Sequence, residues 1–403
     1  MKKVLLVNDF ESGGGAEGVF WLTARLLTGL HEVYTYTAYC GFEESGSNPL
    51  GYIYSRKHFC NIRKIILDKD IGIVHVHNFR WISPSVFGVA RWLRKHHDKE
   101  VKFFLTAHDY LLACPNVAYG YYDRKKVFVR YAPDRLPGLF LFRQMDQHGW
   151  KHSLLKKVQW YLAFRFLKLQ KEIDLVIAPS VFLKNVLQLN NPGLPATVIR
   201  NPVSSDRHYN LEALSIKKRF DDVVRLVYFG RIASEKGTDK LLEMLSKIKN
   251  RITFHLDIYG TGSFREYIPS MIQNLGLGGK VDYHGFKPFD EIRAALPNYD
   301  AFVMSSIWYE NAPLSIVEAA MAGLAIITPD MGGMKELAEL CGDCWFYDLH
   351  DCKSLMACIQ NISTTVIAAS HNRAAKTLHE LFSEEKYIAA LQEVYEENLA
   401  VKA

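Results

Sequence analysis

The sequence predicts an α/β protein of two domains, each built on a parallel β-sheet, and three observations support this fold class. At 403 residues the chain is too long for one compact hydrophobic core and suits two domains of roughly 200 residues. Its composition, 49% apolar and 23% charged, is that of a folded globular protein. Short apolar runs of strand length alternate with segments of helical spacing, which is typical of sheets flanked by helices.

The first half opens on a strand, a glycine-rich turn and a helix. Residues 3–7 form a β run and residues 19–30 have helical spacing, with Gly14, Gly15 and Glu17 between them. Glycine lets the backbone come close to a ligand's phosphates, but the turn matches neither the P-loop nor the dinucleotide fingerprint. Further elements are expected as strands at 33–38, 71–77, 102–106 and 174–178, with a helix at 56–69.

A polar pair, His108 and Asp109, follows the predicted strand at 102–106. Open α/β sheets place ligand contacts at the carboxyl ends of their parallel strands, so the pair is a candidate binding site. A hydrogen-bonded core histidine explains His108 equally well, and the residues alone leave both interpretations open.

Residues 118–172 combine basic and aromatic side chains. They hold 12 Lys and Arg against 4 Asp and Glu, interleaved with aromatic residues. This composition suits an anionic membrane surface, nucleic acid could use it too, and a solvated helix face with core aromatics needs no partner. Charge is uneven over the whole chain as well, since residues 1–200 hold 28 Lys and Arg against 16 Asp and Glu, and residues 201–403 hold 21 against 27. Two domains with different partners would show this division.

The second half repeats the alternation of strands and helices. A cation pair, Arg231 and Lys236, lies in a glycine-bounded loop after the first of these strands, where it forms a clamp for an anion. Gly260 and Phe286 stand in loops at the carboxyl edge of the same predicted sheet. Strands are expected at 223–229, 253–259, 281–284, 300–304 and 324–328, and a last helix at 384–399. We therefore expect domains at 1–203 and 223–382, a linker at 204–222 and a separate C-terminal helix at 383–403.

The segment 305–323 is predicted to be a loop followed by a helix. Pro313 stands where the first helical residue would be, and Gly323 where a helix would stop. The helix would leave first-turn N–H groups without intrahelical partners, and its dipole there favours a phosphate. These N–H groups belong to Leu314, Ser315 and Ile316.

Two glutamates accompany this helix start. Glu310 precedes the first turn, and Glu318 lies about one and a half turns into the helix. Their carboxylates could accept hydrogen bonds from the hydroxyls of a sugar. An ordinary strand–helix unit with two surface glutamates is the alternative that this segment alone leaves open.

No motif argues for a metal ion or a disulfide framework. Seven cysteines, an odd count in a long chain, favour reduced thiols. Cys341, Cys344, Cys352 and Cys358 lie close enough in sequence to suggest zinc, but they fall in a predicted strand and helix. The Asp-Lys-Asp sequence at 68–70 is interpreted as a solvated turn at a helix end.

Glu310 and Glu318, with seven residues between them, resemble the paired-glutamate signature of retaining GT-B glycosyltransferases of the group 1 family. That family includes bacterial polysaccharide glycosyltransferases. The resemblance is strongest over residues 220–340, and the other matching segments are Gly230-Arg231, Lys236, Gly332-Gly333, Glu336, Gly14-Gly15 with Glu17, His108-Asp-Tyr, and Asn201-Pro-Val.

The resemblance implies two Rossmann-like domains facing each other across a cleft, with the C-terminal helix crossing back to the first domain. It implies transfer of a sugar, with retention, from a nucleotide-diphosphate sugar to a glycan or lipid-linked glycan acceptor, without cofactor or metal. Glu310 and His108 would be catalytic, and Glu17 and Asp109 would face the acceptor. The donor would be held by Gly14, Gly15, Arg231, Lys236, Gly260, Phe286, Asn311, Ala312, Pro313, Leu314, Ser315 and Glu318.

The resemblance also implies a place in bacterial surface polysaccharide synthesis, such as O-antigen, capsule or lipopolysaccharide core. No apolar run reaches the roughly 18 to 20 residues that span a bilayer, and the N-terminal apolar stretch is too short for a signal peptide. We therefore expect a cytoplasmic protein, with 118–172 as a candidate contact to the inner membrane and no nucleic acid partner. A nucleotide-sugar epimerase of the same fold, a nucleic-acid-binding protein and an inactive scaffold are the rivals.

Overall fold

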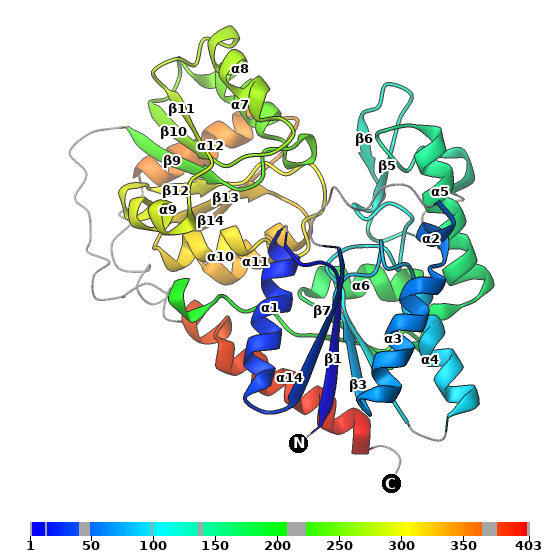
Figure 1. The fold of residues 1–403 in the computed structure, drawn as a ribbon. Helices are drawn as coiled ribbons and strands as arrows, with labels where there is room; N and C mark the ends of the chain where they lie inside the picture. The colour runs from blue at the N-terminus through cyan, green and yellow to red at the C-terminus, as the bar shows by residue number, and fades with distance from the viewer. Residues whose placement is uncertain are drawn as a thin grey trace. The chain divides into compact units, whose positions relative to one another are not determined.

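The computed structural model describes residues 2–12, 14–39, 49–97, 100–135, 140–207, 223–364 and 377–400. The chain divides into two compact units, Met1–Pro202 with Glu384–Ala403, and Val203–Ser383 (Figure 1). Each unit is a six-stranded parallel sheet with helices on its faces. The predicted α/β class with two Rossmann-like halves is confirmed. Of the expected linker, residues 208–222 lie outside the described ranges.

The first unit has the strand order β2-β1-β3-β4-β7-β8. Its central strands are mostly apolar and are buried on both faces, as expected for a parallel sheet between helices. The strands are β1 (Lys3–Phe10), β2 (Glu32–Tyr39), β3 (Ile73–Val76), β4 (Lys102–Thr106), β7 (Leu175–Ala178) and β8 (Ala196–Val198). The helices up to residue 190 are α1 (Gly15–Thr28), α2 (Pro49–Ile53), α3 (Arg56–Asp68), α4 (Ser85–His96), α5 (Trp150–Trp160) and α6 (Val181–Asn190).

The C-terminal helix α14 (Glu384–Ala400) belongs to this first unit, as predicted. Leu391 and Val394 enter the same apolar core as β1 and α1. Two buried hydrogen bonds fix the helix, between the Tyr387 hydroxyl and the Thr23 hydroxyl at 2.7 Å and between the Tyr395 hydroxyl and Nδ1 of His75 at 2.7 Å. The last part of the chain therefore completes the core that the first part begins.

An insertion between β4 and β7 contains the basic aromatic segment. It includes a two-stranded antiparallel hairpin, β5 (Gly120–Tyr122) and β6 (Phe128–Arg130), followed by α5 and a π-helical turn, Tyr161–Phe166. Trp160 anchors it, since the side chain is fully buried and its Nε1 donates to the Leu111 carbonyl at 2.8 Å. Some of the aromatic residues of 118–172 are thus core residues, in agreement with the interpretation of this segment as a solvated helix face with core aromatics.

The second unit has the strand order β11-β10-β9-β12-β13-β14. Its strands are β9 (Val224–Phe229), β10 (Phe254–Tyr259), β11 (Val281–Gly285), β12 (Ala301–Val303), β13 (Ala325–Pro329) and β14 (Cys344–Tyr347). Its helices up to residue 364 are α7 (Thr238–Ile248), α8 (Ile268–Asn274), α9 (Phe289–Ala295), α10 (Leu314–Met321), α11 (Gly332–Cys341) and α12 (Cys352–Thr364). The order reverses between β9 and β12, and such a reversal is where open α/β sheets bind ligands.

Predicted and observed elements differ at a few ends. Helix α1 begins at Gly15, four residues before the predicted start, because the glycine turn itself leads into the first helical turn. Pro313 is the extended residue before α10 and not its first helical residue, with ψ of 107°. Within the described ranges, no helix is both long and apolar enough to cross a bilayer.

Candidate functional site

The candidate site of the second unit lies where its strand order reverses. The loop after β9 carries Arg231 and Lys236, and the loop after β12 carries Glu310. Parallel strands end at the same edge of a sheet, so the two loops meet beyond the carboxyl ends of β9 and β12. Residues 74 positions apart in sequence thereby come into direct contact, as the Lys236–Glu310 pair shows.

Glu310 is the most heavily hydrogen-bonded carboxylate of this site. Its Oε1 accepts from the Lys236 ammonium at 2.5 Å, from the Ser306 hydroxyl at 2.6 Å and from the Trp308 indole N–H at 2.5 Å. Only 9% of the residue is exposed. Burial acts to raise the pKa of Glu310, but Lys236 and the two neutral donors outweigh it and lower the pKa below its ordinary value. The group is therefore held as a carboxylate.

Two glycines allow this close packing. A Cβ on Gly237, whose φ is 64°, would lie 2.2 Å from the Ser305 carbonyl oxygen. A Cβ on Gly333 would lie 1.9 Å from the Asn311 carbonyl oxygen, and the Gly333 N–H donates to the Glu310 carbonyl at 2.9 Å. The start of α11 is thus packed directly against the loop that carries Glu310.

Glu318 projects from α10 and is also buried, with 6% exposed. Its Oε1 accepts from the Arg207 guanidinium at 2.7 Å, and that guanidinium stacks 4.7 Å from the centre of the Phe289 ring. Burial raises the pKa of Glu318, and Arg207 offsets this only in part. The contact to Arg207, inside the predicted linker, was not foreseen.

The start of α10 differs in one detail from the prediction. Pro313 offers no side-chain cap, but the Ile316 N–H donates to the Pro313 carbonyl at 3.0 Å. The prediction that the Ile316 N–H lacks a partner is therefore wrong, because the first turn contains a 3₁₀-type hydrogen bond from residue i to residue i−3. The N–H groups of Leu314 and Ser315 lie too early in the helix to reach a carbonyl one turn before them within it. The helix dipole therefore still favours an anion at this end.

The remaining predicted residues of this unit lie on the same sheet edge. Arg231 is half exposed and pairs with Glu235 at 2.5 Å. Gly260 follows β10 with φ of 146°, and a Cβ there would lie 1.8 Å from the Gly230 carbonyl oxygen. Phe286 follows β11 and is 69% exposed. Asn311 and Ala312 lie in the loop between Glu310 and α10.

In the first unit His108 lies at the end of β4 and contacts a second histidine. Nε2 of His108 and Nδ1 of His77 share a hydrogen bond at 3.1 Å, and the two rings stack. Burial lowers the pKa of His108 to about 4, so the ring is neutral at neutral pH. A cavity of about 10 Å³, room for one water at most, is lined by His77, His108 and Asp109 among others.

Asp109 and Glu17 are both largely buried carboxylates of the first unit. The Asp109 carboxylate accepts from the Leu111 N–H at 2.8 Å, and burial, offset in part by that bond and by Arg80, raises its pKa to about 6. Glu17 lies in the first turn of α1, which begins after the extended residue Gly14. A carboxylate at a helix start is stabilised by the helix dipole, which gives Glu17 a structural explanation beside its predicted role.

The structure thus assembles several predicted residues and adds others. It brings Lys236 and Glu310 into contact, while the Glu318 carboxylate is paired with Arg207, which was not among the predicted site residues. Ser306 and Trp308 were missed, although their positions just before Glu310 were a signal that could have found them. The cysteines 341, 344, 352 and 358 form no three-ligand cluster within the described part of the chain.

Residues 212–364 match the family model for glycosyl transferases of group 1. A glycosyltransferase of unknown role from Methanocaldococcus jannaschii is 30% identical over 119 residues, 30% of each chain. The putative colanic acid biosynthesis glycosyltransferase WcaL of Escherichia coli is 23% identical over 171 residues, 40% of this chain and 42% of WcaL. The chain therefore matches less than half the length of these two relatives.

The similarity to solved structures, unlike that to the two relatives above, extends over nearly the whole chain. A sucrose-phosphate synthase from Thermosynechococcus elongatus gives a TM-score of 0.68 at 16% identity, with both chains fully covered. The lipopolysaccharide outer core galactosyltransferase WaaB gives 0.63 at 17% identity, with 97% of this chain and 99% of WaaB covered. HepE of Anabaena, solved with UDP-glucose, gives 0.62 at 18% identity, with 98% and 100% covered. The fold is that of GT-B glycosyltransferases, and the matched segment supports a group 1 glycosyltransferase over an epimerase or a nucleic-acid-binding protein.

Proposed function

We propose that this protein transfers a sugar from a nucleotide-diphosphate sugar to a glycan or lipid-linked glycan acceptor, with retention at the anomeric carbon. The observation that carries the proposal is the buried Lys236–Glu310 pair at the point where the second sheet reverses its strand order. A cation, an ionised carboxylate and the start of α10 are found there, and each can serve sugar transfer from a diphosphate.

Breaking the glycosidic bond leaves negative charge on the diphosphate while the anomeric carbon becomes cationic. The Lys236 ammonium has three N–H donors, so one can remain on Glu310 while another takes a phosphate oxygen. Arg231, half exposed on the same loop, and the N–H groups of Leu314 and Ser315 would add to the stabilisation. Because these groups supply the positive charge, transfer should not depend on a metal at this site.

Glu310 would accept hydrogen bonds from the hydroxyls of the donor sugar and align it. Its lowered pKa keeps it ionised, and its three donors fix its orientation. Glu318 would hold the ribose diol, whose hydroxyls would share the carboxylate with the Arg207 guanidinium that now bonds Oε1.

For the first unit we retain the predicted roles. His108, kept neutral by burial, would serve at the donor sugar as a hydrogen-bonding group and not as a cation. Gly14 and Gly15 would allow a close approach of the backbone to the donor, and Glu17 and Asp109 would serve the acceptor. WcaL acts in colanic acid biosynthesis by its name, which favours a bacterial surface polysaccharide as the product.

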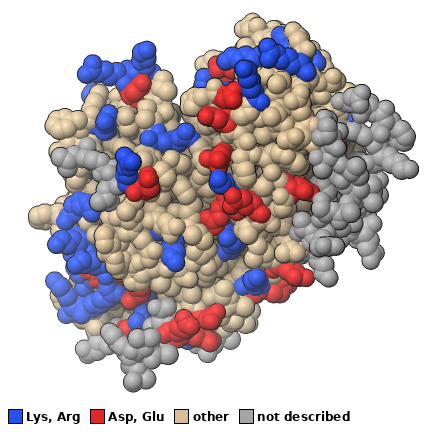
Figure 2. All heavy atoms as spheres, turned by 180° about the vertical axis from the view of Figure 1, so that it is seen from behind, with Lys and Arg blue, Asp and Glu red and all other residues tan. Residues whose placement is uncertain are grey.

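An exposed apolar patch on the first unit supports contact with a membrane that carries the acceptor. It lies on α5 and the turns beside it, and its members are Leu141, Phe142, Trp150, Leu154, Val158 and Phe166. Trp150, Leu154 and Val158 are spaced four residues apart on α5 and so share one face of the helix, and large exposed apolar surfaces on monomeric proteins commonly mark interaction sites. Exposed Arg124, Arg143 and Lys151 accompany the patch, and Figure 2 shows Lys and Arg gathered along the left border of its view, over the first unit. We propose that this patch binds the cytoplasmic face of the inner membrane.

A thermal-shift screen of nucleotide sugars against the purified chain tests the donor site. The donor that binds is then offered with candidate acceptors, and the anomeric configuration of the product is read by NMR. Arg231→Ala should abolish stabilisation by the donor, whereas Arg251→Ala, an exposed arginine of the same unit, should not. Isomerisation of the donor without acceptor would instead identify an epimerase, and donor affinity unchanged in Arg231→Ala would contradict the site.

A further inference from the structure

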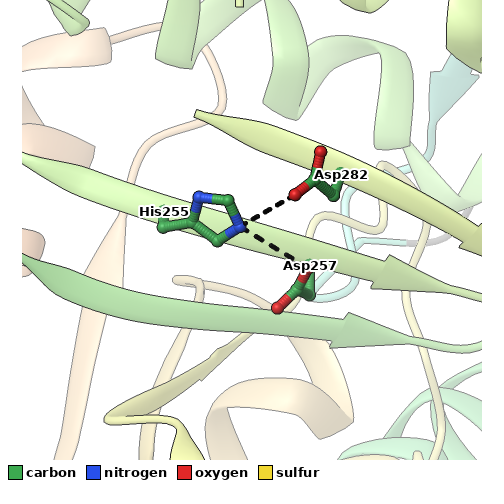
Figure 3. A group of neighbouring side chains, drawn as sticks. All are labelled: His255, Asp257 and Asp282. Atoms are coloured by element: carbon green, nitrogen blue, oxygen red, sulfur yellow. Dashed lines mark ion pairs between the residues drawn. The ribbon is translucent and has the colours of Figure 1, made fainter. Parts of the chain in front are cut away.

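We propose that His255, Asp257 and Asp282 form a binding site for a divalent transition-metal ion, and that Zn²⁺ fits it best (Figure 3). The three residues lie on β10 and β11, away from the loops that carry Lys236 and Glu310. The proposal does not depend on the proposed transferase activity. It concerns a partly exposed face of the sheet edge that β10 and β11 form.

The sheet geometry places the three side chains together. Asp257 and Asp282 are register partners on the parallel strands β10 and β11, and His255 lies two residues before Asp257 on the same face. The alternate residues Leu256 and Ile258 point the other way, into the apolar core. The three polar side chains therefore lie side by side on one face of β10 and β11.

The separations between the candidate ligand atoms match a tetrahedral zinc site. Nε2 of His255 lies 3.2 Å from Oδ2 of Asp282 and 3.6 Å from Oδ1 of Asp257, and all three atoms lie within 4.8 Å of one another. Zinc binds imidazole and carboxylate at about 2.0–2.2 Å, which separates neighbouring tetrahedral ligands by roughly 3.3–3.5 Å. Little movement would let the three atoms reach one ion, and a fourth position would remain for water.

Neighbouring side chains hold the ligands in place, as the outer partners of metal ligands commonly do. Nε2 of His284 donates to Oδ1 of Asp257 at 2.6 Å, and the Tyr299 hydroxyl donates to Oδ2 of the same carboxylate at 2.7 Å. The Tyr299 hydroxyl in turn shares a hydrogen bond with the Tyr259 hydroxyl at 2.8 Å. Asp257 is thus fixed from both oxygens before any ion binds.

Charge supplies a second reason for a cation. Two carboxylates at directly paired positions on neighbouring strands repel one another. A divalent ion would neutralise both, and the imidazole nitrogen selects zinc and its neighbours over Ca²⁺ and Mg²⁺, which prefer all-oxygen ligands. The His255 ring already lies within ion-pair distance of both carboxylates, so the experiment must separate metal binding from this direct contact.

A bound ion would join the edge strand β11 to its neighbour β10. Because an ion that binds only the folded site stabilises the fold by mass action, the melting temperature should rise with zinc concentration. An edge strand with few neighbours is where such a link would matter most.

The test uses the full chain after removal of metals by chelation, with Co²⁺ as a spectroscopic probe and Zn²⁺ as the competitor. One equivalent of Co²⁺ should give visible ligand-field absorption without the thiolate charge-transfer band that cysteine ligands would cause, and one equivalent of Zn²⁺ should remove it. Zinc, but not Mg²⁺, should raise the melting temperature at pH 7.5.

His255→Ala and Asp282→Asn should each weaken cobalt and zinc binding at least tenfold. His148→Ala is the matched control, since His148 also contacts an aspartate, Asp146 at 2.8 Å, but lies in the first unit. Retained binding in His255→Ala, a cobalt spectrum dominated by thiolate bands, or the absence of stoichiometric binding would each overturn the proposal. Should His255→Ala misfold, Asp282→Asn, on an exposed carboxylate, provides the same test.

Discussion

The Lys236–Glu310 pair allows a quantitative test of how the second unit is stabilised. Lys236→Met keeps the length of the side chain but removes the ammonium that donates to Glu310 at 2.5 Å. Glu310 would then be a carboxylate with 9% exposure and two neutral donors, Ser306 and Trp308. Removing one partner of a buried ion pair typically costs about 3–5 kcal/mol, because the other charge stays buried without compensation.

A second substitution separates charge from packing. Glu310→Gln in the Lys236→Met background removes the orphaned charge, while the amide oxygen still accepts from Ser306 and Trp308. Most of the lost free energy of unfolding should return, with a coupling energy of about 2–3 kcal/mol. The penalty of Lys236→Met should also be larger at pH 8 than at pH 5. Without the ammonium, the burial that acts to raise the pKa of Glu310 would be opposed only by Ser306 and Trp308, so we expect the folded state to bind a proton more readily as pH falls.

Urea unfolding at both pH values measures these changes, with hydrogen exchange of residues 224–347 to resolve the second unit, since two units need not unfold in one step. Lys240→Met is the matched control, because Lys240 and Glu243 form an exposed pair at 2.8 Å on α7. That control should cost no more than about 1 kcal/mol. A comparable loss of unfolding free energy in Lys236→Met and Lys240→Met would refute the argument from the buried pair. A coupling energy near zero between Lys236→Met and Glu310→Gln would refute it as well.

Three further predictions follow from particular contacts. Burial raises the pKa of Asp9 from 3.8 to about 7, so the contribution of the protonated carboxyl to stability is fully present below pH 3.8 and is lost as pH rises to about 7. Asp9→Asn should therefore raise the free energy of unfolding by up to about 4 kcal/mol at pH 8 and hardly at all near pH 4. Chemical denaturation at the two pH values checks this, with the exposed Asp68→Asn as control. Gly333→Ala should displace the Glu310 loop and lower donor affinity at least tenfold in a binding titration, because the new Cβ would meet the Asn311 carbonyl at 1.9 Å. The control Gly278→Ala, at a glycine with open space around it, should bind donor normally. Phe142→Ser, at a side chain that is 84% exposed, should reduce sedimentation with anionic liposomes at low salt; equal binding of the wild type to neutral and anionic liposomes would contradict membrane docking.

Much of the fold could be predicted from sequence because the relevant signals are local. Apolar runs at 102–106 and 223–229 became β4 and β9 within one residue, and the helix expected at 56–69 became α3. Local pattern was less reliable at element ends, as Pro313 shows, since a residue's backbone conformation there depends on what the helix start packs against. The domain division and the crossing of α14 followed from chain length and the family resemblance.

The site was predicted less completely. The residue types and spacing of Arg231, Lys236, Glu310 and Glu318 identified the loops, because glycine turns, cations and a helix start are visible in sequence. Which of them touch was not visible. Glu318 bonds Arg207, 111 residues away, and the pairing of Asp257 with Asp282 depends on strand register.

The sequence by itself determined the alternation of strands and helices, the chemistry available in each loop and the basic character of the first half. The tertiary structure decided the strand order, the burial that keeps His108 neutral, the hydrogen-bond donors that keep Glu310 ionised, and the meeting of side chains on β10 and β11. The physical reason is that periodicity and turn chemistry act over a few residues. Burial and ion pairing depend on neighbours that only the packed chain supplies.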